Sequence, residues 1–208
     1  MAKIVTLEKT WLGGEVFILG GGKSLESFDW EVVRSELTIG CNDAYLLGSE
    51  ICSIVVFGDN KWWKVHKDRL EKFKGRVFTN CNYLQTSTIP WVNVMARYQW
   101  GVSNKGLGWN SNTGAAAIDL ALKLGAKKVF LLGFDCHLTE GENNWHENKL
   151  DVPNAAIYPR FSEGFQKLNK AIKIEYPTVD VVNVSDVSSL EVFDKVPLTG
   201  FFEKRNHG

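Results

Sequence analysis

The sequence carries no net charge and no long apolar run, and these two absences narrow the possible functions. Lys plus Arg and Asp plus Glu each number 24 in 208 residues. No face-wide basic field for duplex nucleic acid or for an anionic membrane is therefore expected. No apolar stretch approaches the roughly 20 residues that a membrane-spanning helix requires. The binding of a single nucleotide stays possible, because it needs local donors and not a net charge.

Cysteine is scarce and shows no metal-binding or redox spacing. The four cysteines form no C-x-x-C pair and lie in or beside apolar, strand-like runs: Cys41, Cys52, Cys81 and Cys136. This pattern predicts buried, reduced thiols. Lys3, Glu8 and Lys9 interrupt the apolar core that a secretion signal would need, so a cytoplasmic location is expected. The cytoplasm of a phage-infected bacterium is one location that fits.

Short β-branched runs alternate with helical patterns along the chain. This alternation predicts an α/β fold, a single Rossmann-like domain over residues 1–208 with a mostly parallel sheet and helices on both faces. The predicted strands are 16–19, 37–40, 51–57, 76–79, 128–132 and 179–184. The predicted helices are 25–35, 43–47, 62–73, 113–124 and 161–174. Residues 80–112 are expected to run over the edge of the sheet or over its carboxyl ends.

The stretch ILGGGKSL, residues 18–25, is similar to a phosphate-binding loop but matches neither common motif. A P-loop needs glycine where Phe17 stands, and the dinucleotide fingerprint needs its third glycine where Leu25 stands. What remains is a strand that runs into three glycines, with Ser24 expected to cap the following helix. Contact with a nucleotide and a tight turn that only shapes the fold both stay open.

Small or polar residues follow nearly every predicted strand. Ligands of parallel sheets bind outside the carboxyl ends of the strands, so these residues are expected to converge on one anion-friendly crevice. The predicted nucleotide-binding residues are Gly20, Gly21, Gly22, Ser24, Asn42, Asp43, Asp59, Asn60, Asn112, Thr113, Gly114 and Asp135. Any one of them taken alone also suits a turn or a helix cap. The segment 110–113 favours a ligand, because a cap needs one polar residue and this segment supplies four.

The order of these motifs resembles a known family. The stretches ILGGGKSL, TIGCNDAYLL, VVFGDNKWW, NSNTGAAAIDLALKLGAKKVFLLGFDCHL and NWHENK are similar to the family that joins bacterial lipooligosaccharide sialyltransferases to the MptE-like 6-hydroxymethylpterin pyrophosphokinases. The sequence looks closest to short phage- or prophage-encoded members. The resemblance covers about residues 16–190, with 80–105 matching poorly. The resemblance implies a nucleotide pocket lined by Gly20 to Ser24, Asn42, Asp59, Asn60, Asn112 to Gly114 and Asp135.

The sequence also departs from the sialyltransferase pattern. Gly21 and Lys23 stand where those enzymes carry Asn and Pro, which alters the donor contact at this turn. Those enzymes also use two tyrosines after the aspartate that corresponds to Asp135. Here Cys136 and His137 follow that aspartate, and Tyr158 is only a distant substitute. The departure bears on a sialic-acid donor more than on nucleotide binding.

A glycosyl transfer of this kind needs a base that takes the proton of the acceptor hydroxyl, and imidazole suits this at neutral pH. His146 is the predicted base, in a polar loop beside Trp145, which is expected to stack on a sugar or a base. Glu147 or Asp135 is expected to orient it. The alternative is a surface histidine in a mobile loop. His137 is the reserve candidate, two residues after Asp135.

The remaining two histidines are given no catalytic role. His66 is interpreted as solvated and His207 as part of the tail. One alternative function is pyrophosphoryl transfer from ATP, with Mg²⁺ on Asp59 and Asp135. The other is a non-catalytic phage protein that binds or sequesters a nucleotide. No cofactor is predicted with certainty and no metal site is proposed. The eight tryptophans make a homo-oligomer possible.

Overall fold

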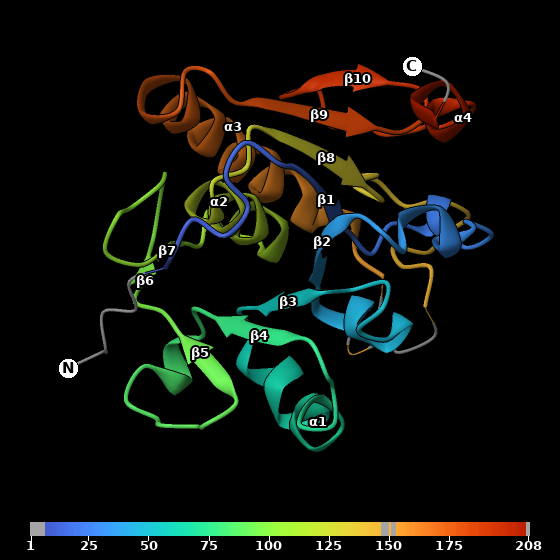
Figure 1. The fold of residues 1–208 in the computed structure, drawn as a ribbon. Helices are drawn as coiled ribbons and strands as arrows, with labels where there is room; N and C mark the ends of the chain where they lie inside the picture. Colours follow the sequence, from blue (N-terminus) through green and yellow to red (C-terminus); the bar gives the residue numbers. More distant parts are fainter. Residues whose placement is uncertain (1–6, 147–149, 151–152, 207–208) are drawn as a thin grey trace.

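The computed structural model describes residues 7–146, 150 and 153–206. An eight-stranded sheet forms its centre, in the order β10-β9-β8-β1-β2-β3-β4-β5, and every pair in it is parallel (Figure 1). Its strands are β1 Glu15–Leu19, β2 Leu37–Cys41, β3 Ile54–Phe57, β4 Arg76–Thr79, β5 Val92–Val94, β8 Lys128–Leu132, β9 Asp180–Val184 and β10 Asp194–Val196. The predicted α/β class, a parallel sheet between helices, is confirmed.

The sheet separates two apolar cores because successive side chains of a strand point to opposite faces. Val16 and Ile18 of β1 pack with the helices α2 Thr113–Leu124 and α3 Tyr158–Glu175. Phe17 and Leu19 pack on the other face, with α1 Asn60–Leu70 and α4 Phe201–Asn206. Figure 1 shows α2 and α3 together on one side of the sheet and α1 on the other side. Burial on both faces explains why the strands read as continuous apolar runs.

Helix α2 has the bounds that the sequence predicts, because both of its ends carry strong signals. The Asn112 side chain accepts from the Ala115 N–H at 2.7 Å and caps the first turn. Gly125 ends the helix with φ of 99°, a left-handed conformation that glycine adopts without steric cost. Three consecutive alanines, residues 115–117, are fully buried and let the helix approach the sheet closely.

The predicted helix 25–35 is wrong. The chain forms two 3₁₀ turns instead, η1 Lys23–Leu25 and η2 Trp30–Val33. Asp29 is extended, and its carboxylate accepts from the Glu31 N–H, so a new turn starts where the helix should have continued. Ser24 does not cap either turn. The predicted helix 43–47 is likewise a 3₁₀ turn, η3 Asn42–Leu47, and the strand predicted from residue 51 begins at Ile54.

Residues 80–112 run over the sheet edge, as predicted. They form η4 Asn82–Leu84, add β5 to the edge of the sheet, and then make a two-stranded parallel pair, β6 Arg97–Tyr98 and β7 Leu107–Gly108. At the chain's other end, α4 is docked by Phe201 and Phe202, whose rings contact Phe17. None of the helices in the described residues has the length and apolarity needed to cross a membrane.

Candidate functional site

The order of strands places a crevice between β1 and β8. The chain leaves β1 toward β2 on one side, and β8 pairs with β1 on the other. In open parallel sheets this reversal of strand order leaves room for a ligand at the carboxyl ends. A cavity of about 760 Å³ opens there, walled by segments that follow β1, β2, β3 and β8 and by the first turns of α2 and α3. That size suits a ligand as large as a nucleotide.

The structure brings most of the predicted site residues together around this cavity. Those that line it are Gly20, Gly21, Gly22, Asn42, Asp43, Asp59, Asn112, Thr113, Gly114, Asp135, His137 and His146. Ser24 and Asn60 do not line it. The residues come from strand ends that are far apart in sequence, so their convergence follows from the parallel sheet. Their roles toward a ligand stay predictions.

The glycine turn after β1 is joined to the exit of β8 by backbone hydrogen bonds. The N–H of Gly20 donates to the carbonyl of Leu132 at 2.8 Å, and the N–H of Gly22 donates to that of Gly133 at 2.9 Å. Both amides are thus engaged within the fold. A side chain at Gly22 would also lie 2.5 Å from the carboxyl carbon of Asp135. Close backbone approach is therefore the reason for glycine here.

Asp135 is held by Ser24. Its two carboxylate oxygens accept from the Ser24 N–H at 2.9 Å and from the Ser24 hydroxyl at 2.6 Å. Asp135 is almost fully buried, and these bonds satisfy both of its oxygens. Ser24, which was expected to cap a helix, instead links the glycine turn to the end of β8. The predicted pairing of Asp135 with His146 is not among the contacts of the described residues.

Trp145 holds the loop that carries His146. Its backbone N–H donates to the Gly21 carbonyl at 2.9 Å, and its indole N–H donates to the Gly20 carbonyl at 3.0 Å. Its ring packs against Trp30, with centroids 5.4 Å apart, and it does not line the cavity. The expectation that Trp145 stacks on a ligand is therefore wrong. The tryptophans that line the cavity are Trp62 and Trp109.

His146 lies inside the cavity, next to a carboxylate that the sequence did not pair with it. Its Nε2 is 3.9 Å from Oδ2 of Asp43, and its side chain is only 10% exposed. The interpretation as an exposed loop histidine is wrong on this point. Glu147, its other predicted partner, lies outside the described residues, as does His207.

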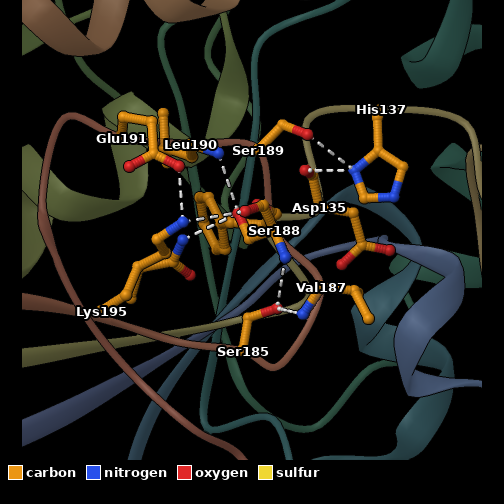
Figure 2. Close-up of polar contacts among 11 residues, drawn as sticks. Asp135, His137, Ser185, Val187, Ser188, Ser189, Leu190, Glu191 and Lys195 are labelled. Carbon is orange, nitrogen blue, oxygen red and sulfur yellow. Dashed lines mark hydrogen bonds and ion pairs between the residues drawn. The ribbon is translucent and has the colours of Figure 1, made fainter.

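His137 also lines the cavity and is held by its own neighbours (Figure 2). Its Nδ1 is 2.9 Å from the backbone carbonyl of Asp135 and 3.2 Å from the hydroxyl of Ser189. Its Nε2 is 3.3 Å from the hydroxyl of Thr139. Both ring nitrogens therefore have protein partners. The loop after β9 adds to this anchorage, because the Ser188 hydroxyl donates to the Phe134 carbonyl at 2.6 Å.

His66 is buried, and its interpretation as a solvated residue is wrong. The side chain is 2% exposed and its Nδ1 lies 2.9 Å from the hydroxyl of Tyr45. Trp62, His66 and Leu70 are spaced four residues apart and form the buried stripe of α1, which faces the sheet. The charged neighbours in sequence lie on the solvent side of the same helix. Burial lowers the pKa of His66, although Asp43 opposes this effect.

The first turn of α2 provides the electropositive wall of the cavity. The first N–H groups of a helix have no acceptor within the helix, and the helix dipole favours an anion there. Asn112 uses its side chain on the Ala115 N–H, while Thr113 and Gly114 line the cavity. The Thr113 hydroxyl donates to the Asn42 side chain at 3.3 Å. This contact joins the exit of β2 to α2.

Unusual backbone conformations gather around the cavity. Asn42, Ser111 and Cys136 have positive φ values of 51°, 64° and 55°, and all three line it. Non-glycine residues rarely adopt this region, and such strain is concentrated at functional sites. Burial raises the pKa of the Cys136 thiol to about 12, so this cysteine stays protonated and does not suit a nucleophilic role.

The start of α3 contributes Arg160 and Phe161, which sequence reasoning missed, and Tyr158, which it named only as a distant substitute. Tyr158, Arg160 and Phe161 line the cavity from its first turn. Burial, with smaller effects from Cys136 and Asp135, raises the pKa of Tyr158 to about 12, so its hydroxyl remains a donor. Arg160 is the one permanently cationic side chain among the described residues that line the cavity. A signal existed, because a helix that leads into a parallel strand starts at the carboxyl edge of the sheet.

The carboxylates proposed for Mg²⁺ already have structural partners. Asp59 accepts from the Trp62 N–H at 3.0 Å and caps α1, and Asp135 accepts from Ser24. Among residues 7–146, 150 and 153–206, no group of three or more His, Cys, Asp or Glu side chains is arranged to hold a metal ion.

The fold is similar to that of the sialyltransferase CstII from Campylobacter jejuni, whose structure contains a substrate analogue, cytidine-5'-monophosphate. The match has a TM-score of 0.54 and covers 89% of this chain and 85% of that one, at 13% sequence identity. The chain has a sialyltransferase-like fold. No protein-family model matches the chain, and no curated protein matches it. The expected likeness to the pyrophosphokinases stays a prediction.

Replacement of Gly22 by alanine tests the close backbone contact between the glycine turn and the end of β8. The added Cβ would lie 2.6 Å from the Gly133 carbonyl oxygen, a backbone atom that has little freedom to move. We expect a loss of about 1–3 kcal/mol in the free energy of unfolding, measured by urea denaturation. Gly21→Ala is the matched control, because its nearest contact is the Asn144 side chain, which can rotate away. Equal losses in the two variants would contradict this account of the turn.

Proposed function

We propose that this protein binds a nucleotide sugar in the cavity and transfers the sugar to a hydroxyl group of an acceptor. The observation that carries the proposal is the convergence of the strand-exit residues and the α2 N-terminus on one cavity at the strand-order reversal. The similarity in fold to a sialyltransferase that was solved with cytidine-5'-monophosphate supports it. Donor sugar, nucleotide base and acceptor are left open.

The cavity offers separate surfaces for the parts of a nucleotide. The phosphate is assigned to the first turn of α2 and to Arg160, which lie on its walls. The ribose is assigned to the polar side chains after β2 and β3, Asn42 and Asp59. Trp109 offers an aromatic surface for the base, and Arg97 covers one side of its ring at 4.0 Å from the centroid.

The chemistry that we propose is a direct displacement. His146 takes the proton of the acceptor hydroxyl while that oxygen forms a bond to the anomeric carbon. The bond between the anomeric carbon and the phosphate oxygen breaks, and the nucleotide leaves with the electron pair. Tyr158 keeps its proton at neutral pH and lines the same cavity, so it can donate a hydrogen bond to the departing phosphate. It takes the part that the resemblance gives to the tyrosine pair.

Two other functions use the same cavity and are separated by experiment. A pyrophosphoryl transfer from ATP would use Asp59 and Asp135, which both line it, to hold Mg²⁺. A non-catalytic nucleotide-binding protein would use the cavity to bind its ligand and would not need His146 as a general base. The first function requires Mg²⁺ for tight binding of ATP, and the second gives binding without any product.

A thermal-shift screen of CMP, UDP, GDP and ATP species, with and without Mg²⁺, tests the proposed function. We expect a nucleotide or its sugar conjugate to raise the melting temperature without Mg²⁺, because a ligand that binds only the folded state stabilises it. Stabilisation by ATP with Mg²⁺ alone would replace the proposal with the pyrophosphokinase function. No stabilisation by any compound would end the enzyme assignment.

His146→Ala tests the base. Removal of a general base costs about 10²–10⁴-fold in turnover, while the affinity for the nucleotide should change little. Turnover is measured as release of free nucleotide from the sugar conjugate that binds in the screen, and affinity by calorimetry. His137→Ala is the control, because His137 is the reserve candidate and lines the same cavity. A normal rate in His146→Ala with a slow His137→Ala would exchange their roles.

Arg160→Ala tests the assignment of the phosphate. A charge-assisted hydrogen bond contributes about 1.5–3 kcal/mol, so the dissociation constant of the nucleotide should rise by roughly tenfold or more. Lys167→Ala is the matched control: it removes a positive charge from the same helix, at a site paired with Glu163 and outside the cavity. Binding that weakens equally in both variants would show a general effect of charge and would remove Arg160 from the site.

A further inference from the structure

Asp43 and His146 were expected to have separate roles, one in nucleotide binding and the other as the base, yet they lie close to each other. Oδ2 of Asp43 is 3.9 Å from Nε2 of His146, and both side chains line the cavity. We propose that Asp43 is the positioning residue of His146, and that Tyr45, Trp62 and His66 hold this carboxylate in place. The inference rests on the proposed function, in which His146 is the base, and it deepens that function.

The Asp43 carboxylate also contacts two side chains of α1. The indole N–H of Trp62 donates to its Oδ2 at 2.8 Å. Nε2 of His66 lies 3.5 Å from its Oδ1, which has no hydrogen-bond partner among the described residues. Asp43 is 3% exposed, and a buried ionised oxygen without a partner is costly. A positive charge on His146 would offset that cost, since it would lie within ion-pair distance of the carboxylate.

The contact with the Tyr45 hydroxyl orients the His66 ring so that its Nε2 is the nitrogen near Asp43. Burial raises the pKa of Tyr45, so its hydroxyl keeps its proton and can donate to Nδ1 of His66, 2.9 Å away. The proton of a neutral His66 then lies on Nε2, which faces Oδ1 of Asp43. Trp62 stacks on the His66 ring, with centroids 4.4 Å apart and planes 6° from parallel. The ring of His66 therefore has little freedom to turn.

The consequence for His146 is electrostatic and geometric. An opposite charge within about 4–6 Å favours the charged form of a group, so Asp43 would stabilise the imidazolium that forms when His146 takes a proton. A separation of 3.9 Å is an ion-pair distance and is longer than a hydrogen bond. Catalytic contacts of this kind are often long without substrate and shorten in the complex.

Other titratable groups near Asp43 and His66 come from two elements in the described residues. η3 contributes Tyr45, and α1 contributes His66 and Arg69. The glycine turn and Asn144, which pack beside His146, bring no charge. Arg69 opposes the effect of Asp43 on His66. Asp43 is thus a negative charge at ion-pair distance from His146, and its removal is the informative change. With Asp43 assigned to His146, contact with the ribose is left to Asn42 and Asp59.

The test measures the ionisation of His146 directly by ¹⁵N-edited NMR of the imidazole rings. The chain has four histidines, and His146→Gln identifies the signal of His146. In Asp43→Asn the pKa of His146 should fall by about one pH unit or more, since the variant keeps the shape but loses the charge. Asp59→Asn is the matched control. It removes one negative charge from the same cavity, and asparagine still caps α1.

Two results would overturn the proposal. One is a pKa of His146 that is unchanged in Asp43→Asn, and the other is an equal fall in Asp59→Asn. If Asp43→Asn does not fold, the unmodified protein still decides, because pairing through Nε2 requires neutral His146 to carry its proton there. A proton on Nδ1 of neutral His146 would exclude the pairing.

This readout needs no substrate, so it separates the inference from the proposed function. Failure of every nucleotide to bind would end the function, while the NMR result would still show whether Asp43 and His146 form a pair. Where turnover is found, Asp43→Asn should move the acid limb of the pH–rate profile to lower pH by the same amount as the pKa. A normal profile in that variant would refute the positioning role and leave the transferase assignment intact.

Discussion

The joint between the end of β1 and the end of β8 is the constraint on which the site depends. Two amides of the glycine turn donate to the carbonyls of Leu132 and Gly133 at the end of β8, and the Asp135 carboxylate accepts both the N–H and the hydroxyl of Ser24. β1 and β8 are paired along their length, and these bonds continue that pairing past the strand ends. The turn fixes the loop as well, because its carbonyls accept from Trp145 and thereby place His146. The glycine turn is similar in sequence to a phosphate-binding loop, but its hydrogen bonds join the end of β1 to the end of β8.

The cavity combines groups that are unfavourable for stability. Three of its residues have left-handed backbone conformations without being glycine, and the buried Asp43 carboxylate has one oxygen with no hydrogen bond among the described residues. Such features persist only where the surrounding structure holds them, and they are typical of sites that bind a ligand. The packed α2, with its alanines against the sheet, and the aromatic stripe of α1 supply that support. Stability in the two cores permits strain at the crevice.

Much of the fold could be predicted from the sequence. Buried parallel strands are read as apolar β-branched runs, and the Asn112 and Gly125 signals gave the bounds of α2 correctly. The segment 25–35 was misread because its apolar spacing is helical, while the turn at Asp29 interrupts it locally. His66 was misread because its charged neighbours in sequence hid the four-residue spacing of the buried stripe. The Asp29 turn and the four-residue spacing are both present in the sequence, but helical apolar spacing and charged neighbours are the stronger local signals.

The sequence by itself determined the class of the fold, the position of the strand exits and the kinds of polar residues found there, because strand periodicity and turn chemistry are local properties. Only the tertiary structure decided which of those residues touch. Asp135 bonds to Ser24 and Asp43 lies against His146, across 111 and 103 positions of sequence. It also brought Tyr158 and Arg160 into the cavity. Pairings at such separations depend on the order of strands in the sheet, which no local pattern encodes.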